Sequence, residues 1–391
     1  MTRTARKRMV LFCLVLPILL LAFALPVGAE GAQMSGESEE IVEEWEAFQA
    51  AIPPEVQDLL PRDFFSQDIT LVAKGVQEAS TLSAILRAVG QVMGVTLTQN
   101  LALLAKLCGI LVLAATFRAA VGERKNGIEG AISLVTVLAI TLMLFAGEET
   151  KFSQMEQFFD TVRTVCLSLI PLMGALYAMG GNVAAAVANH GVMSGFLAIL
   201  ETACSGVVVP VACALVALAI LDAVTGKASL ASLAALLRRT FTLGLSFFMM
   251  LLTFVLGMQH TLAKGSDTLA LRTVRFAAGS FLPVVGGSIS ESLRTVAGSV
   301  EYLRGAVGIG GILVVFFLFL PTFLTVLLTR ITFSLSSAVA GLLSCSREQK
   351  LLGEISSVWG YFLAVIACLF VMTVFSLTLF AHSAAAIAEG G

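Results

Sequence analysis

Residues 305–329 read GAVGIGGILVVFFLFLPTFLTVLLT, an uncharged run between Arg304 and Arg330. A helix needs about 20 apolar residues to cross the hydrocarbon core of a bilayer, so this run is long enough to span one. A backbone in lipid must satisfy its own hydrogen bonds, which a single apolar segment achieves only as a helix. We therefore predict a transmembrane helix here, and this helix sets the fold class.

The rest of the chain repeats this pattern. Of its 391 residues, 58% are hydrophobic and 13% charged, whereas ordinary soluble domains carry about 25% charged residues. A net charge of −2 gives no basic field for nucleic acid. The sequence predicts an all-α, polytopic transmembrane helical bundle. Further spans are predicted at residues 101–120, 131–146, 164–221, 240–259 and 355–381.

The N-terminus has the three parts of a secretory signal peptide. A basic start that includes Arg3 and Arg8 precedes an apolar run over residues 10–25, and small residues then allow cleavage after Ala29. The alternative is an uncleaved first helix. Pro17 interrupts the apolar run and a polar stretch follows it, which favours cleavage. We therefore interpret residues 1–29 as a signal peptide, so the mature chain begins outside the cytoplasm.

Residues 30–98 form a segment that we expect to be exported. Its start is rich in glutamate, and from residue 64 to 104 apolar residues recur at threes and fours, as on one face of a helix. This pattern fits an interfacial or partner-packing helix and equally a solvated linker before the membrane. Residues 99–391 then form the transmembrane domain.

An internal repeat is the second large-scale feature. The order Thr-Val-Arg followed by Pro-x-x-Gly occurs over residues 161–174 and again over residues 273–286, which is 112 residues later. An uncharged run precedes each copy, and a proline-containing helix follows it. We predict repeat units at about 128–221 and 240–330. The alternative is coincidence between apolar helices that use few residue types.

The Pro-x-x-Gly steps and one acid within an apolar stretch are the candidate functional residues. Proline removes a backbone donor, so Pro171 with Gly174 and Pro283 with Gly286 each predict a broken or re-entrant helix beside an internal path. The alternative is a kink used only for packing. Glu201 lies inside an apolar stretch, where an ionisable group usually faces a cavity or a partner, unless it sits near a helix end.

Charge placement predicts the orientation of the first spans. Arg118, Arg124 and Lys125 lie on the cytoplasmic side if the signal peptide is cleaved, and Glu148 and Glu149 then lie outside. Beyond this point the charges decide little. Six crossings result if both Pro-x-x-Gly segments are re-entrant, and eight result if both cross fully.

One known family shares several of these motifs. The sequence resembles the stage III sporulation protein AE family over most of the mature chain, and Pro-Val-Val-Gly is the most specific of the shared elements. The shared elements are RFA at 275–277, FLPVVGG at 281–287, SES at 290–292, GAVG at 305–308, LIPLMG at 169–174 and the glycine pair at 180–181.

The resemblance implies a function. Members belong to an eight-protein set in endospore-forming bacteria, located in the mother-cell membrane around the forespore. With a forespore partner the set builds a channel-like secretion apparatus that supports late forespore gene expression and is powered by a separate cytoplasmic ATPase. The expected partners are therefore the other membrane proteins of the set, this ATPase, the lipid bilayer and further copies of the chain.

The motifs of common enzyme classes do not occur in suitable contexts, so we expect no enzymatic activity and no cofactor or metal. A secondary transporter for a small solute is the alternative function, because paired broken helices are typical of transporter folds. The predicted spans are poor in polar side chains that would bind a solute or coupling ion, which favours the channel component.

The signal peptide gives a first testable prediction. The mature protein is expected to start at about residue 30, because the small residues before it suit signal peptidase. N-terminal sequencing of the protein extracted from membranes measures this directly. A chain that retains Met1 would contradict the prediction and reverse the expected topology.

Overall fold

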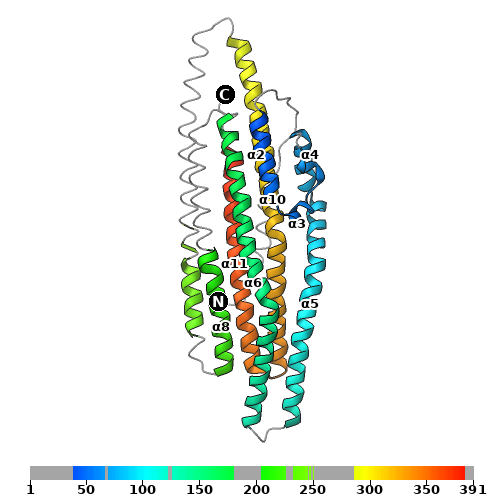
Figure 1. The fold of residues 1–391 in the computed structure, drawn as a ribbon, viewed down its shortest axis with the longest axis vertical. Coiled ribbons are helices and arrows are strands. Elements are labelled where there is room, and N and C mark those ends of the chain that lie inside the picture. Colours follow the sequence, from blue (N-terminus) through cyan, green and yellow to red (C-terminus); the bar gives the residue numbers. More distant parts are fainter. Residues whose placement is uncertain are drawn as a thin grey trace.

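The computed structural model describes residues 38–66, 69–121, 126–179, 204–225, 232–244, 246–247, 250 and 286–383. Within them the chain is helical and contains no strand. The helices form an elongated bundle (Figure 1). Their bounds are α2 Ser38–Ala51, α3 Pro54–Gln57, η1 Arg62–Phe65, α4 Ile69–Ala79, α5 Leu82–Val121, α6 Asn126–Met179, η2 Cys204–Val208, α8 Val209–Thr225, α10 Gly286–Leu342 and α11 Ser346–Ser383. The all-α prediction is confirmed.

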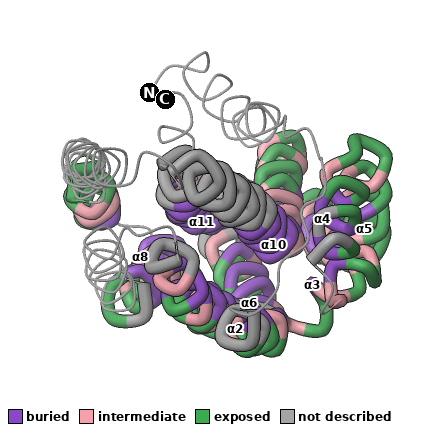
Figure 2. Tube along the Cα trace, turned by 90° about the horizontal axis from the view of Figure 1, so that it is seen from above, coloured by how far each residue is buried: buried purple, intermediate pink, exposed green. Residues whose placement is uncertain are grey.

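The long helices α10 and α11 form the centre of the bundle. They pack against each other along their length, and α5, α6 and α8 pack around them (Figure 2). Side chains from residue 310 to 320 of α10 are buried without interruption. Phe319 of α10 contacts Phe158 of α6 at 5.1 Å and Phe370 of α11 at 5.4 Å between ring centroids. The apolar run that opened the sequence analysis is therefore the core of the bundle.

A tight turn joins the two central helices. Ser344 has a φ of 58°, in the left-handed region, and the Cys345 amide donates to the Ala340 carbonyl at 2.8 Å. This is the hydrogen-bond pattern that ends a helix when the next residue reverses the chain. Residue 344 therefore sets the angle at which α11 returns along α10.

Helices α2, α3, η1 and α4 pack on the bundle toward the end opposite the α10–α11 turn. Trp45 and Phe48 of α2 are buried where α2 packs on α6, and Phe64 of η1 is buried beside Trp45 at 5.5 Å between ring centroids. A Cβ atom at Gly310 of α10 would lie 3.3 Å from the Phe64 ring, so the cap also touches the centre. We call residues 38–79 the N-terminal cap. This segment packs on the bundle and is not a free linker before the membrane.

Five described helices are long and apolar enough to cross a membrane. They are Leu82–Ala120, Lys151–Ala175, Gly206–Thr225, Val307–Leu342 and Ser346–Val374, and Gly130–Phe145 is a shorter apolar helix. The coarse prediction of a multi-pass helical protein therefore holds. The helices run past the predicted borders, since α5 continues through residue 98 and α10 continues through Arg330.

The predicted break at Pro171 does not occur. Helix α6 runs without interruption from Asn126 to Met179, with Pro171 inside it. Pro171 itself is exposed, whereas Leu169, Ile170 and Leu172 beside it are buried. A proline inside a helix costs about 3 kcal/mol, which packing of this apolar face offsets. The internal repeat is not confirmed, because residues 251–285 of the second copy lie outside the described residues.

The fit of the cap around Gly75 gives a second prediction. A Cβ atom at Gly75 of α4 would lie 2.5 Å from the backbone nitrogen of Phe64, so Gly75→Ala should destabilise the cap by about 2 kcal/mol. We expect faster limited proteolysis between residues 38 and 79 and a shift in Trp45 fluorescence. Gly109→Ala is the matched control, because nothing lies within 4 Å of its Cβ position. Equal proteolysis rates in both variants would contradict the predicted packing.

Candidate functional site

The first turns of α11 carry three charged residues that each bind a different part of the bundle. Glu348 pairs with Arg118 of α5, Lys350 pairs with Asp222 of α8, and Glu354 pairs with Arg238. All three ion pairs lie near the α10–α11 turn. They fix the positions of the surrounding helices relative to α11, and we call these residues together with Ser133 the lower polar layer.

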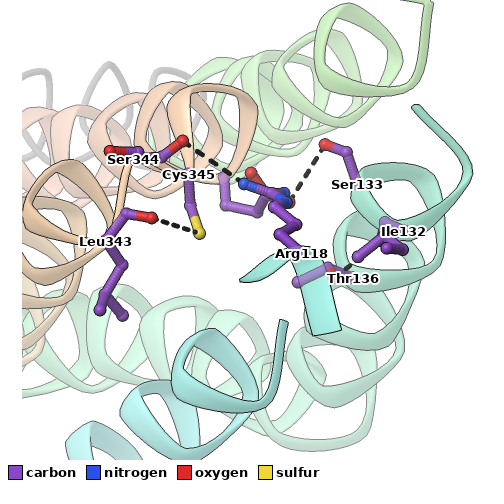
Figure 3. A network of polar contacts seen from close by, with 8 residues as sticks. Arg118, Ile132, Ser133, Thr136, Leu343, Ser344 and Cys345 are labelled. Carbon is purple, nitrogen blue, oxygen red and sulfur yellow. Dashed lines mark hydrogen bonds and ion pairs between the residues drawn. The ribbon is translucent and has the colours of Figure 1, made fainter. Parts of the chain in front are cut away.

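Glu348 is the most deeply buried member of this layer. Its side chain is 0% exposed, and its Oε1 atom accepts from Arg118 and from the Ser133 hydroxyl at 3.1 Å. Arg118 also reaches the Ser344 carbonyl at the turn (Figure 3). The Oε2 atom of Glu348 has no partner among the described residues. A buried carboxylate costs several kcal/mol to desolvate, so Glu348 depends on Arg118 for its place.

The other two pairs differ in burial. Lys350 Nζ lies 2.6 Å from Asp222 Oδ2, with Asp222 5% exposed and Lys350 46% exposed. Arg238 Nη2 lies 2.9 Å from Glu354 Oε2, and both side chains are about one-third exposed. Solvent screens the Arg238–Glu354 pair more than the Arg118–Glu348 pair. The Arg238–Glu354 pair therefore contributes less to stability.

A second polar layer crosses the bundle further along the same helices. Lys151 of α6 donates to the Thr329 hydroxyl of α10 at 3.4 Å, and Thr329 donates to Asn100 Oδ1 of α5 at 3.1 Å. Asn100 in turn donates to the Thr96 carbonyl at 2.9 Å. Lys151 also lies over the Trp359 ring of α11, 5.6 Å from its centroid. These residues form the upper polar layer, which joins four helices.

The spacing of the two layers is the same on two helices. Residues 100 and 118 of α5 are as far apart in sequence as residues 133 and 151 of α6. At a rise of 1.5 Å per residue both intervals measure about 27 Å. The hydrocarbon core of a bilayer is about 30 Å thick. The two polar layers are therefore separated by nearly the thickness that a bilayer needs.

Much of the surface between the layers is apolar, although Lys106 of α5 is exposed there and Glu148 and Glu149 of α6 precede Lys151 in the same interval. On α6 the stretch from Ser133 to Phe145 carries no charge, and its outward side chains are large hydrophobic ones. Beyond the upper layer α6 exposes Glu156 and Asp160 instead. Exposed apolar residues between the layers are Val112, Leu113 and Phe117 of α5, and Leu134, Val135, Leu138, Leu142 and Phe145 of α6. This change from apolar to acidic marks the end of a surface suited to lipid.

The sequence-predicted site residues are not brought together among the described residues. Pro171 and Gly174 both lie within the unbroken helix α6. Gly286 is the first residue of α10. Glu201 and Pro283 lie outside the described residues. A role of these five residues in an internal path stays a prediction, and the local break expected at Pro171 is wrong.

Sequence reasoning missed the polar layers. Arg118 entered it only as a charge on the cytoplasmic side. In the structure Arg118, Arg238 and Lys350 each bind an acid on another helix. A signal was available in Asp222, an acid at the end of a long apolar stretch, and in the mixed charges of residues 346–354. The pairing itself depends on helices that are far apart in sequence.

The chain is similar to one known protein family. The family model for stage III sporulation protein AE matches residues 65–384. The chain belongs to this family. Stage III sporulation protein AE of Bacillus subtilis (strain 168) is 26% identical over 279 residues, covering 70% of each chain. No solved structure matches. Both polar layers fall within the family match, whereas helix α2 of the cap precedes it.

The buried pair gives a third prediction. Glu348→Leu alone and Arg118→Met alone should each leave a largely buried charge without its partner and lower stability by about 3 kcal/mol. Replacing both residues, as Arg118→Met with Glu348→Leu, should cost much less, because no charge then stays buried alone. Thermal unfolding in one detergent, followed by Trp fluorescence, measures this double-mutant cycle. Additive effects of the two single changes would show that the residues do not interact.

Proposed function

We propose that this protein is a non-enzymatic integral membrane component of a sporulation channel or secretion complex that links mother cell and forespore and supports late forespore gene expression. Membership of the stage III sporulation protein AE family supports a sporulation role. The observation that carries the proposal further is the length of the bundle. Helix α10 has 57 residues, which corresponds to about 85 Å, nearly three times the hydrocarbon thickness.

The two polar layers support a position for the bilayer. We infer that lipid surrounds the part of the bundle between them, where α5 and α6 expose apolar side chains. The C-terminal end of α5, where Arg118 lies, then faces the cytoplasmic side, in keeping with the positive-inside rule. The N-terminal cap lies on the opposite side, as expected for an exported segment. The upper half of the bundle would stand outside the mother-cell membrane, toward the forespore.

We propose a partner for each of the two ends. The cytoplasmic end is available to the ATPase of the same complex. The part beyond the upper layer faces the other stage III sporulation membrane proteins. A component that connects a cytoplasmic motor to parts outside the membrane must resist deformation. Ion pairs that tie α5, α8 and α11 together provide such resistance at the level of the membrane.

A secondary transporter is less well supported. A transporter needs polar groups that converge on a solute near the middle of the membrane. Among the described residues the buried charges pair with each other across helices. The transporter interpretation also depended on two broken helices, and α6 runs through Pro171 without a break.

A charge-reversal experiment in an endospore-forming host tests the proposed function. The chromosomal gene is replaced by wild type, a deletion, Arg118→Glu, Glu348→Arg or the reversed pair. We expect the deletion and both single changes to lose late forespore reporter activity, and the reversed pair to recover part of it. Membrane abundance of each variant is measured by immunoblot, so that lost activity is separated from lost protein. Full late reporter activity in the deletion strain would refute the function.

A further inference from the structure

A helix at residues 232–244, yellow-green in Figure 1, lies at one edge of the bundle. Arg238 pairs with Glu354 of α11, and Phe241 contacts Tyr361 of α11 at 4.8 Å between ring centroids. Both contacts advance in the same direction along the two helices, so this helix is parallel to α11. Helix α11 leads from the lower polar layer to the upper one, and the helix at residues 232–244 therefore starts on the side of the lower layer.

The outward face of this helix is apolar except for one arginine. Arg239 is exposed, with Leu236 one turn before it and Leu243 one turn after it on the same face. These two leucines are 62% and 61% exposed. Arg238 lies about 100° away around the helix, where Glu354 holds it against α11. The Arg238–Glu354 pair thus keeps Arg239 on the outward face.

The charge of Arg239 is not balanced within the described part of the bundle. The three bases of the lower polar layer, Arg118, Arg238 and Lys350, are matched by the three acids to which they bind. Arg239 and Arg347 are exposed, and neither has an acidic partner among the residues whose side chains the structure describes. An excess of positive charge therefore reaches the surface at the lower layer.

The direction of the helix determines where the Arg239 side chain ends. Side chains on a helix are tilted toward its N-terminus, which here lies on the side of the lower polar layer. The guanidinium of Arg239 therefore reaches back toward that layer. The exposed side chains of Leu243, Phe247 and Met250 follow in the opposite direction, toward the apolar part of the surface. A charged group at the end of a lipid-facing apolar face is favourable when it reaches the headgroup region.

This arrangement matches the two parts of a phospholipid. In the bilayer position inferred above, the headgroups lie at the lower polar layer. A guanidinium binds a phosphate through paired, charge-assisted hydrogen bonds. The acyl chains of the same lipid would then lie along Leu243, Phe247 and Met250, which are open to them.

We propose that Arg239 and the apolar face beside it bind an anionic phospholipid in the leaflet at the lower polar layer. The excess of positive charge favours phosphatidylglycerol, whose headgroup is negative, over phosphatidylcholine, whose headgroup carries its own cation. The proposal rests on the bilayer position inferred above, but it does not depend on which complex the protein serves. Lipid headgroups bound here would hold the bundle at a fixed depth in the membrane.

The test measures lipid binding to the full-length protein by native mass spectrometry. Delipidated protein in one detergent is titrated with dioleoylphosphatidylglycerol or with dioleoylphosphatidylcholine, and the affinity for the first bound lipid is determined. Arg239→Gln removes the proposed anchor. Arg62→Gln is the matched control, because it removes the same charge from an exposed position in the N-terminal cap. Thermal unfolding without lipid checks that both variants fold like wild type.

We expect wild type and Arg62→Gln to bind phosphatidylglycerol more tightly than phosphatidylcholine. Arg239→Gln should lower the affinity for phosphatidylglycerol by about fivefold, the contribution of one basic residue at an anionic surface. Arg239→Lys keeps the charge without the paired hydrogen bonds, so it should retain part of the preference.

Three results would overturn the proposal. They are equal affinity of wild type for the two lipids, wild-type affinity in Arg239→Gln, and an equal loss in Arg62→Gln, which would mean that net charge alone attracts the lipid. The measurement uses purified protein and no sporulating cell. Failure of lipid binding is therefore distinguishable from failure of the proposed function, which is read from the forespore reporter.

Discussion

The burial of charge at the start of α11 is the constraint on which the bundle depends. Glu348 is removed from water entirely and is held by Arg118 and Ser133, which come from two other helices. Lys350 adds a third helix through Asp222. A buried charge is stable only when its partner is in place, so α5, α6 and α8 have little freedom to slide along α11. The apolar contacts between the same helices are less selective, because many registers bury a similar area.

The upper polar layer applies the same constraint at a second level. Lys151, Thr329 and Asn100 connect α6, α10 and α5 through successive hydrogen bonds. Polar contacts at two levels fix both the position and the tilt of a helix, whereas contacts at one level would let the helix tilt about that point. The spacing of the layers suits a bilayer, so the part of the bundle that would lie in lipid is also the part most strictly held.

Beyond the upper layer the bundle is stabilised in a different way. The aromatic side chains of Phe158, Phe319 and Phe370 interlock, and the N-terminal cap covers α6 through Trp45 and Phe48. A helical assembly that continues far past the membrane has apolar surface to share with other proteins. This architecture fits the proposed role of connecting two cells.

The sequence by itself determined the fold class, because apolar runs as long as residues 305–329 predict long helices that must be buried in protein or lipid. It also predicted the family, through motifs that lie close together in the chain. It did not predict the course of α6 through Pro171, since local chemistry gives the cost of proline but not the packing of Leu169 and Leu172 that offsets it. The polar layers were decided only by the tertiary structure. Arg118 and Glu348 are 230 residues apart, and no local pattern indicates that their helices bring them together.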